Sequence, residues 1–376
     1  MEPDPSPSIL VSAGEPSGDL HGAEVVRAFR ERFPAARVDA VGGPLMAAAG
    51  ANILCPIEAL GALGLVEIVE KIPAHVRLYY TLRRALRDQT YQLVIPIDYP
   101  GFNLRLSLAA TAAGIPVLYY IAPQLWAWGP GRAKRFAKAI DHMAVILPFE
   151  EGFFNRLGLA TSFVGHPLLD GDPWPSHQEA RRTLAIDHDD RVLALFPGSR
   201  PQEIRAHWPL FRRASIQLLE EGLCRRVLVG ATEDGMYPDP GPVEVIHGQP
   251  VRVLAAADAA LAKSGTTTLQ AAVAGTPMVV AYRTAALTAF VARRVMTVRW
   301  VSLVNLIAER QIVPELLQEN FTERRLLEEI RPLLTPGDPA REAQLEGLSD
   351  VRSRLGQPGA ADRVVELALE LVPAWR

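Results

Sequence analysis

The chain alternates short apolar runs with stretches of helical periodicity, and this alternation limits its possible folds more than any other feature. Parallel strands that helices cover on both faces are buried throughout, so they are nearly continuous apolar runs. The sequence therefore predicts α/β domains built on parallel sheets. In the first half, the expected strands are residues 9–13, 37–41, 92–97, 117–121 and 143–147, and the expected helices are 20–33, 102–113 and 132–140.

Residues 169–176 interrupt the pattern with a cluster of glycine and proline, which is typical of a linker. The alternation then resumes, with expected strands at 192–196, 227–229, 243–246, 259–262 and 278–281, helices at 203–221, 267–274 and 286–296, and helical stretches at 323–334, 341–355 and 360–371. We therefore expect two doubly wound, Rossmann-like domains on either side of a central cleft. Their predicted bounds are 1–168 and 177–355, with a C-terminal helix in 356–376 that packs back toward the N-terminal domain.

The composition excludes several classes of protein. The 376 residues are 49% hydrophobic, which is enough to build buried cores. A net charge of −3 excludes a broad basic surface for nucleic acid. The 2 cysteines are too few for a disulfide framework or a cysteine metal site. An acidic, proline-rich start and the lack of a long apolar run argue against a signal peptide or a membrane span, so we expect a cytoplasmic protein.

A glycine-rich loop over residues 14–22 joins the first expected strand to the first helix. It is not a G-x-G-x-x-G motif and has no phosphate-loop lysine, which disfavours a dinucleotide oxidoreductase. Its carboxylates, Glu15 and Asp19, also argue against a simple anion cradle. The alternative is a tight turn in which Ser17 or Asp19 caps the helix.

Asp98 ends an apolar strand and is the best candidate for a general base. At the floor of a cleft, desolvation raises the pKa of a carboxylate toward the working pH of a base. The alternative is a helix cap, a role that Asn103 could also supply. Trp126 and Trp128 follow the next strand, where core packing and contact with a sugar or an acyl chain are both open.

In the second half, two expected helices begin with residues that suit a phosphate. Ser199 and Arg200 precede one helix, and residues 264–266, Ser-Gly-Thr, precede another. Backbone N–H groups, the helix dipole and a guanidinium all favour an anion at such a position. Together these loops predict a nucleotide diphosphate site opposite the Asp98 carboxylate.

Residues 60–86 combine an apolar start with a basic and aromatic continuation. This pattern is typical of an amphipathic segment at a membrane surface, and an ordinary helix packed on the sheet is the alternative. The residues expected to contact lipid are Leu63, Leu65, Val66, Ile68 and Val69.

Read together, these loops resemble the lipid-A-disaccharide synthase family, bacterial glycosyltransferases of the GT-B fold. The matching segments, in family order, are residues 14–19 (GEPSGD), 97–103 (IDYPGFN), 124–128 (QLWAW), 163–167 (FVGHP), 197–200 (PGSR), 263–266 (KSGT) and 301–306 (VSLVNL). The resemblance implies an inverting transfer from UDP-2,3-diacylglucosamine to 2,3-diacylglucosamine 1-phosphate, which gives a β(1→6) disaccharide and UDP. It also implies a peripheral inner-membrane location and no metal or other cofactor, and it leaves a homodimer open.

The resemblance also implies roles for individual residues. Asp98 would be the base for the acceptor hydroxyl, with Glu15, Ser17 and Asp19 in the acceptor-side loop. The residues expected to bind the nucleotide are Ser199, Arg200, Ser264, Gly265, Thr266, Gln270 and Asn305.

Three positions depart from the family pattern. Gln270 stands where the family usually has glutamate, Val304 replaces a proline, and Glu309 replaces a glycine. An amide at position 270 still bonds a hydroxyl, without the added strength of a charge. A second hypothesis is therefore a relative that binds nucleotide sugar or lipid without turnover. The retained Asp98 and Arg200 favour the enzyme.

Overall fold

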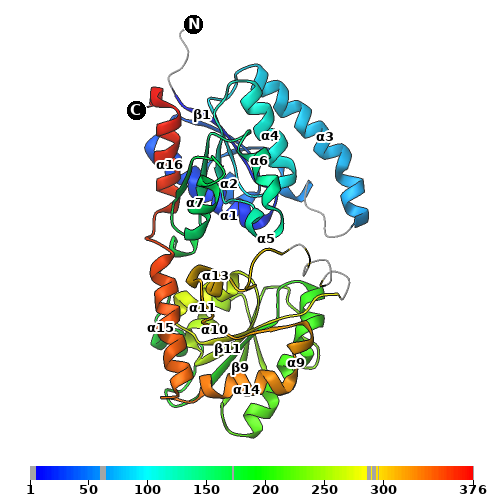
Figure 1. The fold of residues 1–376 in the computed structure, drawn as a ribbon, viewed down its shortest axis with the longest axis vertical. Coiled ribbons are helices and arrows are strands. Elements are labelled where there is room, and N and C mark those ends of the chain that lie inside the picture. The colour runs from blue at the N-terminus through cyan, green and yellow to red at the C-terminus, as the bar shows by residue number, and fades with distance from the viewer. Residues whose placement is uncertain are drawn as a thin grey trace. The chain divides into compact units, whose positions relative to one another are not determined.

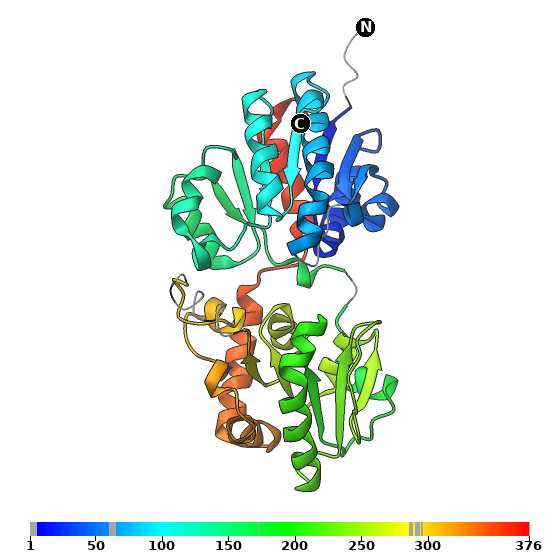
Figure 2. The same ribbon diagram turned by 90° about the vertical axis from the view of Figure 1, so that its right-hand side faces the viewer.

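The computed structural model describes residues 6–59, 65–171, 173–285, 289, 294 and 296–375, without the side chains of 65–71, 128 and 130. The chain forms two units: an N-terminal unit of residues 1–170 and 355–376, and a C-terminal unit of residues 171–354. Both are parallel α/β units, as the alternating pattern predicts (Figures 1 and 2). The central cleft stays a prediction.

The N-terminal unit has a four-stranded sheet of order β3-β2-β1-β4 and a three-stranded sheet of order β5-β6-β7. Parallel bridges from Val94 to Val117 and from Ile97 to Tyr120 join β4 to β5. The strands are β1 (Ser8–Ser12), β2 (Arg37–Gly42), β3 (Asn52–Pro56), β4 (Leu93–Pro96), β5 (Leu118–Tyr120), β6 (His142–Val145) and β7 (Thr161–Phe163).

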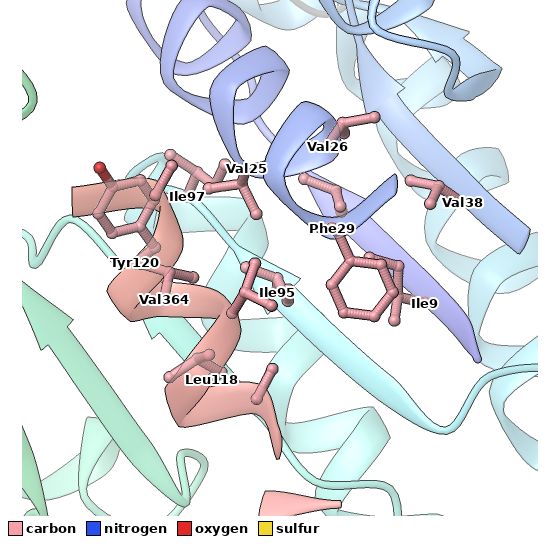
Figure 3. Packing of buried hydrophobic residues seen from close by; sticks show 14 of the residues in the cluster. Ile9, Val25, Val26, Phe29, Val38, Ile95, Ile97, Leu118, Tyr120 and Val364 are labelled. Carbon is pink, nitrogen blue, oxygen red and sulfur yellow. The ribbon is translucent and has the colours of Figure 1, made fainter. Parts of the chain in front are cut away.

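Helices separate these strands and cover both faces of the sheet. They are α1 (Pro16–Arg32), α2 (Pro44–Ala48), α3 (Leu65–Arg87), α4 (Pro100–Ala112), α5 (Leu125–Trp128), α6 (Ala133–Phe136), α7 (Pro148–Asn155) and α16 (Ala360–Leu371). Neighbouring side chains of a strand point to opposite faces, so Ile9 and Val11 join one core cluster and Leu10 joins the other. The first cluster includes Val364, because α16 packs against α1 (Figure 3).

The C-terminal unit has one six-stranded parallel sheet of order β10-β9-β8-β11-β12-β13, the order of a doubly wound dinucleotide fold. Its strands are β8 (Val192–Phe196), β9 (Arg226–Ala231), β10 (Glu244–His247), β11 (Ala259–Lys263), β12 (Met278–Tyr282) and β13 (Glu315–Leu317). Its helices are α8 (His177–Thr183), α9 (Pro201–Glu220), α10 (Pro250–Ala256), α11 (Thr266–Ala274), α13 (Leu303–Ala308), α14 (Glu323–Leu334) and α15 (Pro339–Arg354). Contacts pair α9 with α14, and α11 with α10, α13 and α15.

Some elements differ from the sequence-based expectations. The strands β3, β7 and β13 were not predicted, since β3 alternates between exposed and half-buried residues and the other two have only 3 residues each. The helix expected over 132–140 is only the short α6 after a 3-10 turn at Pro130–Arg132. Most of the helix expected over 286–296 lies outside the described residues.

Candidate active site

Asp98 lies two residues after the end of β4, in a backbone conformation that its neighbours hold in place. Asp98 and Tyr99 both have left-handed φ angles, 43° and 50°, which are strained for residues with a side chain. The Asp98 N–H donates to the Tyr120 carbonyl at 3.1 Å. Its own carbonyl accepts from Tyr119 Oη at 2.6 Å and from Asn103 Nδ2 at 2.8 Å. These contacts offset the strain and hold the Asp98 backbone in this conformation.

The Asp98 carboxyl group is suited to a general base. The helix-cap interpretation is wrong, because Tyr99 is the N-cap residue of α4 and no side chain caps that helix. Burial and, to a smaller extent, the negative charge of Glu15 raise the pKa of Asp98 to about 6, while the Tyr99 N–H and His21 act in the opposite direction. A carboxyl group with this pKa is ionised near neutral pH and still accepts a proton readily.

The glycine-rich loop divides its polar residues between two tasks. Glu15 and Ser17 are exposed, whereas Asp19 is buried. The Asp19 carboxylate accepts from the backbone N–H groups of Gly43, Leu45 and Met46 at 2.7–3.1 Å, which caps α2. Both predictions for Asp19 are therefore corrected. It caps a neighbouring helix instead of its own, and its carboxylate is occupied inside the protein instead of being available to the acceptor.

The strand-end loops of this unit contact one another through Tyr99. A Cβ atom at Gly14 would meet the Tyr99 ring at 2.3 Å, so only glycine allows the ring to lie on this backbone. On its other side, the Tyr99 hydroxyl lies 2.7 Å from His75 Nε2 of α3. The glycine-rich loop, the Asp98 loop and α3 therefore form one packed cluster.

Glu150, at the start of α7, belongs to this region and was not singled out from the sequence. It is 1% exposed and accepts from the Trp126 indole N–H at 2.9 Å and from the Leu147 N–H at 3.2 Å. Burial and, to a smaller extent, the charge of Asp98 raise the pKa of Glu150 to about 7, although these donors oppose the rise. Its place just after Pro148, at a helix start that follows a buried strand, is the sequence feature that could have revealed it.

Two histidines belong to this region: His21 acts on Asp98, and His166 is near enough to His21 to feel its charge. The Nδ1 atom of His21 is buried and has no hydrogen-bond partner, and its ring lies 3.8 Å from the Glu24 carboxylate. His166 is buried and accepts from the Leu168 N–H through Nδ1. Burial and the charge of His21 lower the pKa of His166 to about 4, so its imidazole is neutral at physiological pH.

In the C-terminal unit, the loop between β8 and α9 carries an exposed Ser199 and an exposed Arg200. The Glu203 carboxylate accepts from the N–H groups of both residues, at 3.2 and 3.5 Å, and forms a 2.9 Å ion pair with Lys263. Burial would raise the pKa of Glu203, but Lys263 and the two N–H groups hold it below its usual range. Donors that would suit a phosphate thus face an internal carboxylate, a feature that the sequence-based interpretation did not include.

The second expected anion site follows β11. Gly265, with φ 150°, precedes α11, where Thr266 is exposed and Gln270 is half-buried. Ser264 is buried, and its hydroxyl donates to the Val301 carbonyl at 3.0 Å. The loops after β8 and β11 lie together, because these strands are neighbours in the sheet and Lys263 reaches Glu203.

Asn305 does not fit the expected role in nucleotide binding. Its side chain is fully buried in α13. The amide nitrogen donates to the Val313 carbonyl and to Glu315, and the amide oxygen accepts from the N–H groups of Ile312 and Val313. Both ends of the amide are occupied within the unit, so Asn305 supports the segment that leads into β13.

The residues expected to contact lipid are described only in part. Leu63 lies outside the described residues, as do the side chains of Leu65, Val66, Ile68 and Val69. The rest of α3 carries an exposed apolar row, Ile72, Val76 and Tyr80, which are 50%, 44% and 61% exposed. None of the described helices has the length and apolar content that a membrane span requires.

Solved structures of low sequence identity share this fold. The UDP-GlcNAc 2-epimerase from Neisseria meningitidis, bound to UDP-GlcNAc, matches with a TM-score of 0.65 at 13% identity and covers 96% of this chain and 100% of its own. The calicheamicin glycosyltransferase CalG4 matches with a TM-score of 0.61 at 19% identity, over 98% of this chain and 99% of its own. The fold is therefore of the GT-B type.

Sequence comparison defines the family. The family model described as lipid-A-disaccharide synthetase matches residues 9–358. The lipid-A-disaccharide synthase of Myxococcus xanthus is 39% identical over 98% of this chain and 99% of its own, and that of Syntrophus aciditrophicus is 38% identical over 97% of each. The chain belongs to the lipid-A-disaccharide synthetase family, and it is a glycosyltransferase that uses a nucleotide sugar.

Proposed function

We propose that this protein transfers diacylglucosamine from UDP-2,3-diacylglucosamine to 2,3-diacylglucosamine 1-phosphate, with inversion at the anomeric carbon. The acceptor 6-hydroxyl oxygen forms the new bond to the anomeric carbon, and the bond from that carbon to UDP breaks. The hydroxyl proton passes to the Asp98 carboxylate. The products are the β(1→6) disaccharide 1-phosphate and UDP.

The observation that carries this proposal is the state of Asp98. Its backbone is fixed by Tyr119, Tyr120 and Asn103, its carboxyl group does not cap a helix, and burial raises its pKa to about 6. A strained, desolvated carboxyl group is costly to maintain, and such groups gather at functional sites. Glu15, whose charge acts on Asp98, and Ser17 are exposed in the glycine-rich loop and are suited to bonding the acceptor hydroxyls.

The donor nucleotide is assigned to the loops after β8 and β11. The exposed Arg200 offers a guanidinium for a bidentate bond to phosphate, and Ser199, Gly265 and Thr266 lie in the same two loops. Ser264 precedes α11 directly before Gly265, and Gln270 is a half-buried residue within that helix. Positive and N–H groups at this position would stabilise the charge that develops on the leaving UDP.

A product assay tests the proposal. The purified protein is incubated with the UDP-diacylglucosamine donor and the diacylglucosamine 1-phosphate acceptor, and the mixture is analysed by mass spectrometry. We expect the disaccharide 1-phosphate together with UDP, and neither product when either substrate is left out. If UDP binds but no disaccharide forms, the protein is a relative without turnover and the proposal is wrong.

We also propose that the protein works as a peripheral protein at the inner face of the inner membrane. Both proposed substrates carry acyl chains, and α3 presents a row of exposed apolar residues four apart, Ile72, Val76 and Tyr80. The opposite face of α3 is anchored, because Leu78, Leu82 and Leu86 are buried. Exposed basic residues on the same helix, Arg83 and Arg84, suit anionic headgroups.

Vesicle flotation tests the location. Replacing Ile72, Val76 and Tyr80 by serine, or Leu65, Val66 and Val69 by serine, should each release the protein from vesicles that contain anionic lipid. Met236, which is 81% exposed in the C-terminal unit, supplies a matched control, and Met236→Ser should float like the wild type. Unchanged flotation of both triple variants would contradict the assignment.

A further inference from the structure

The carboxyl group of Glu150 lies in the protein core, where burial of an ionisable group is unfavourable. The residue is 1% exposed and lies at the first turn of α7 in the N-terminal unit. A helix cap needs only one of its oxygens, Oε2, which accepts from the Leu147 N–H at 3.2 Å. The other oxygen, Oε1, accepts from the Trp126 indole N–H at 2.9 Å. The second contact is therefore not explained by capping.

Trp126 links Glu150 to β5, the strand whose residues bond the Asp98 backbone. It lies in α5, which begins five residues after β5 ends at Tyr120. The last two residues of β5, Tyr119 and Tyr120, are those that bond the Asp98 backbone. The Trp126 and Phe149 rings pack edge to face, with their centroids 4.9 Å apart. Two consecutive residues of α7, Phe149 and Glu150, therefore contact Trp126.

We propose that Glu150 is a positioning residue for the acceptor-side site, which fixes Trp126 and thereby α5 beside the Asp98 loop. This inference rests on the proposed function, in which Asp98 is the reacting group. Burial and the charge of Asp98 raise the pKa of Glu150, so the two carboxyl groups are near enough to interact. The other groups that act on Asp98 are Glu15, His21 and the Tyr99 N–H.

Titration of the protein without substrate tests the contact itself. The difference in tryptophan emission between the wild type and Trp126→Phe should change with pH as Glu150 titrates, with a midpoint near its pKa of about 7. In Asp98→Asn the midpoint should move to lower pH, because a neighbouring negative charge is gone. Glu150→Gln should abolish this transition. A midpoint that does not respond to Asp98→Asn would overturn the link between the two groups.

Kinetics test the consequence. Glu150→Ala and Trp126→Phe should each raise the acceptor KM or lower kcat by about tenfold, with an unchanged donor KM. The reason is that a small displacement of the residues that position the reacting groups slows the reaction. Glu150→Gln retains an oxygen for the indole and should stay within about threefold of the wild type. The double variant Glu150→Ala with Trp126→Phe should be no worse than either single variant, because both break one contact.

The outcomes separate this inference from the proposed function. If Asp98→Asn keeps its turnover, the base assignment fails while the emission titration still decides the contact. If Asp98→Asn is inactive but Glu150→Ala and Trp126→Phe lower kcat and raise both KM values equally, Glu150 is only a helix cap and the inference is wrong. If Glu150→Ala does not fold, Glu150→Gln and Trp126→Phe decide the question.

Discussion

The Asp98 loop of the N-terminal unit and the Arg200 loop of the C-terminal unit both follow strands of a parallel sheet, yet they are prepared in opposite ways. Around Asp98 the backbone is strained, the carboxyl group caps no helix, and burial raises its pKa. Beside Arg200, the carboxylate of Glu203 already occupies the backbone N–H groups and pairs with Lys263. The proposed base is therefore held ready before substrate binds, whereas a phosphate at the proposed nucleotide loop would compete with Glu203.

Replacing Asp98 by asparagine gives the strongest test of this contrast. Asparagine has nearly the same shape but takes up no proton, so turnover should fall by about a thousandfold, within the usual range for loss of a general base. UDP affinity, measured by calorimetry, should equal that of the wild type, because the proposed nucleotide loops lie in the other unit. Normal turnover in this variant would remove Asp98 as the base.

The pH dependence of kcat/KM tests the raised pKa of Asp98 directly. With its pKa raised to about 6, the base is ionised above that pH and protonated below it, so kcat/KM should fall about tenfold per pH unit below pH 6. Glu15→Gln removes a negative charge that raises this pKa, and the acid limb should therefore move to lower pH. Ser17→Ala, in the same loop, is the control that should leave the limb in place. A limb that stays at the same pH in Glu15→Gln would show that the two carboxylates do not interact.

Much of the fold could be predicted from the sequence, because fully buried parallel strands are continuous apolar runs. The runs at β1, β4, β8 and β11 are of this kind, and each was placed to within a residue or two. The edge strand β3 escaped notice because its residues alternate in exposure. A short strand such as β13 depends on pairing with β12, which no local pattern reveals.

The candidate site was harder to predict, because residue type does not say where a side chain is already bonded. Asp98 was identified because it ends an apolar strand, where desolvation raises the pKa of a carboxylate toward that of a general base. Asp19 and Asn305 carry equally polar groups, but contacts with distant backbone N–H groups occupy them. Glu203 and Glu150 are polar residues at helix starts, where capping is common, and only the fold places them beside Lys263 and Trp126.

On the nucleotide side, Arg200→Ala should weaken UDP binding by about tenfold, the loss expected for one charge-assisted contact to phosphate. The side chain is exposed, so the fold should tolerate the change. Arg205, also exposed on α9, supplies the matched control, and Arg205→Ala should bind UDP like the wild type. Calorimetry that finds wild-type affinity for Arg200→Ala would refute the assignment.

Glu203→Gln produces the smallest expected effect and tests the contrast most directly. Glutamine retains an oxygen for the N–H groups of Ser199 and Arg200 but removes the negative charge that holds Lys263. If the phosphates of UDP compete with Glu203 for these donors, the variant should bind UDP a few times more tightly, on the order of threefold for a partly exposed pair. The difference in UDP affinity between Glu203→Gln and the wild type should shrink at high salt, because screening weakens the interactions of partly exposed charges. Weaker binding of UDP by Glu203→Gln would mean that the carboxylate supports the phosphate loop instead of competing for it.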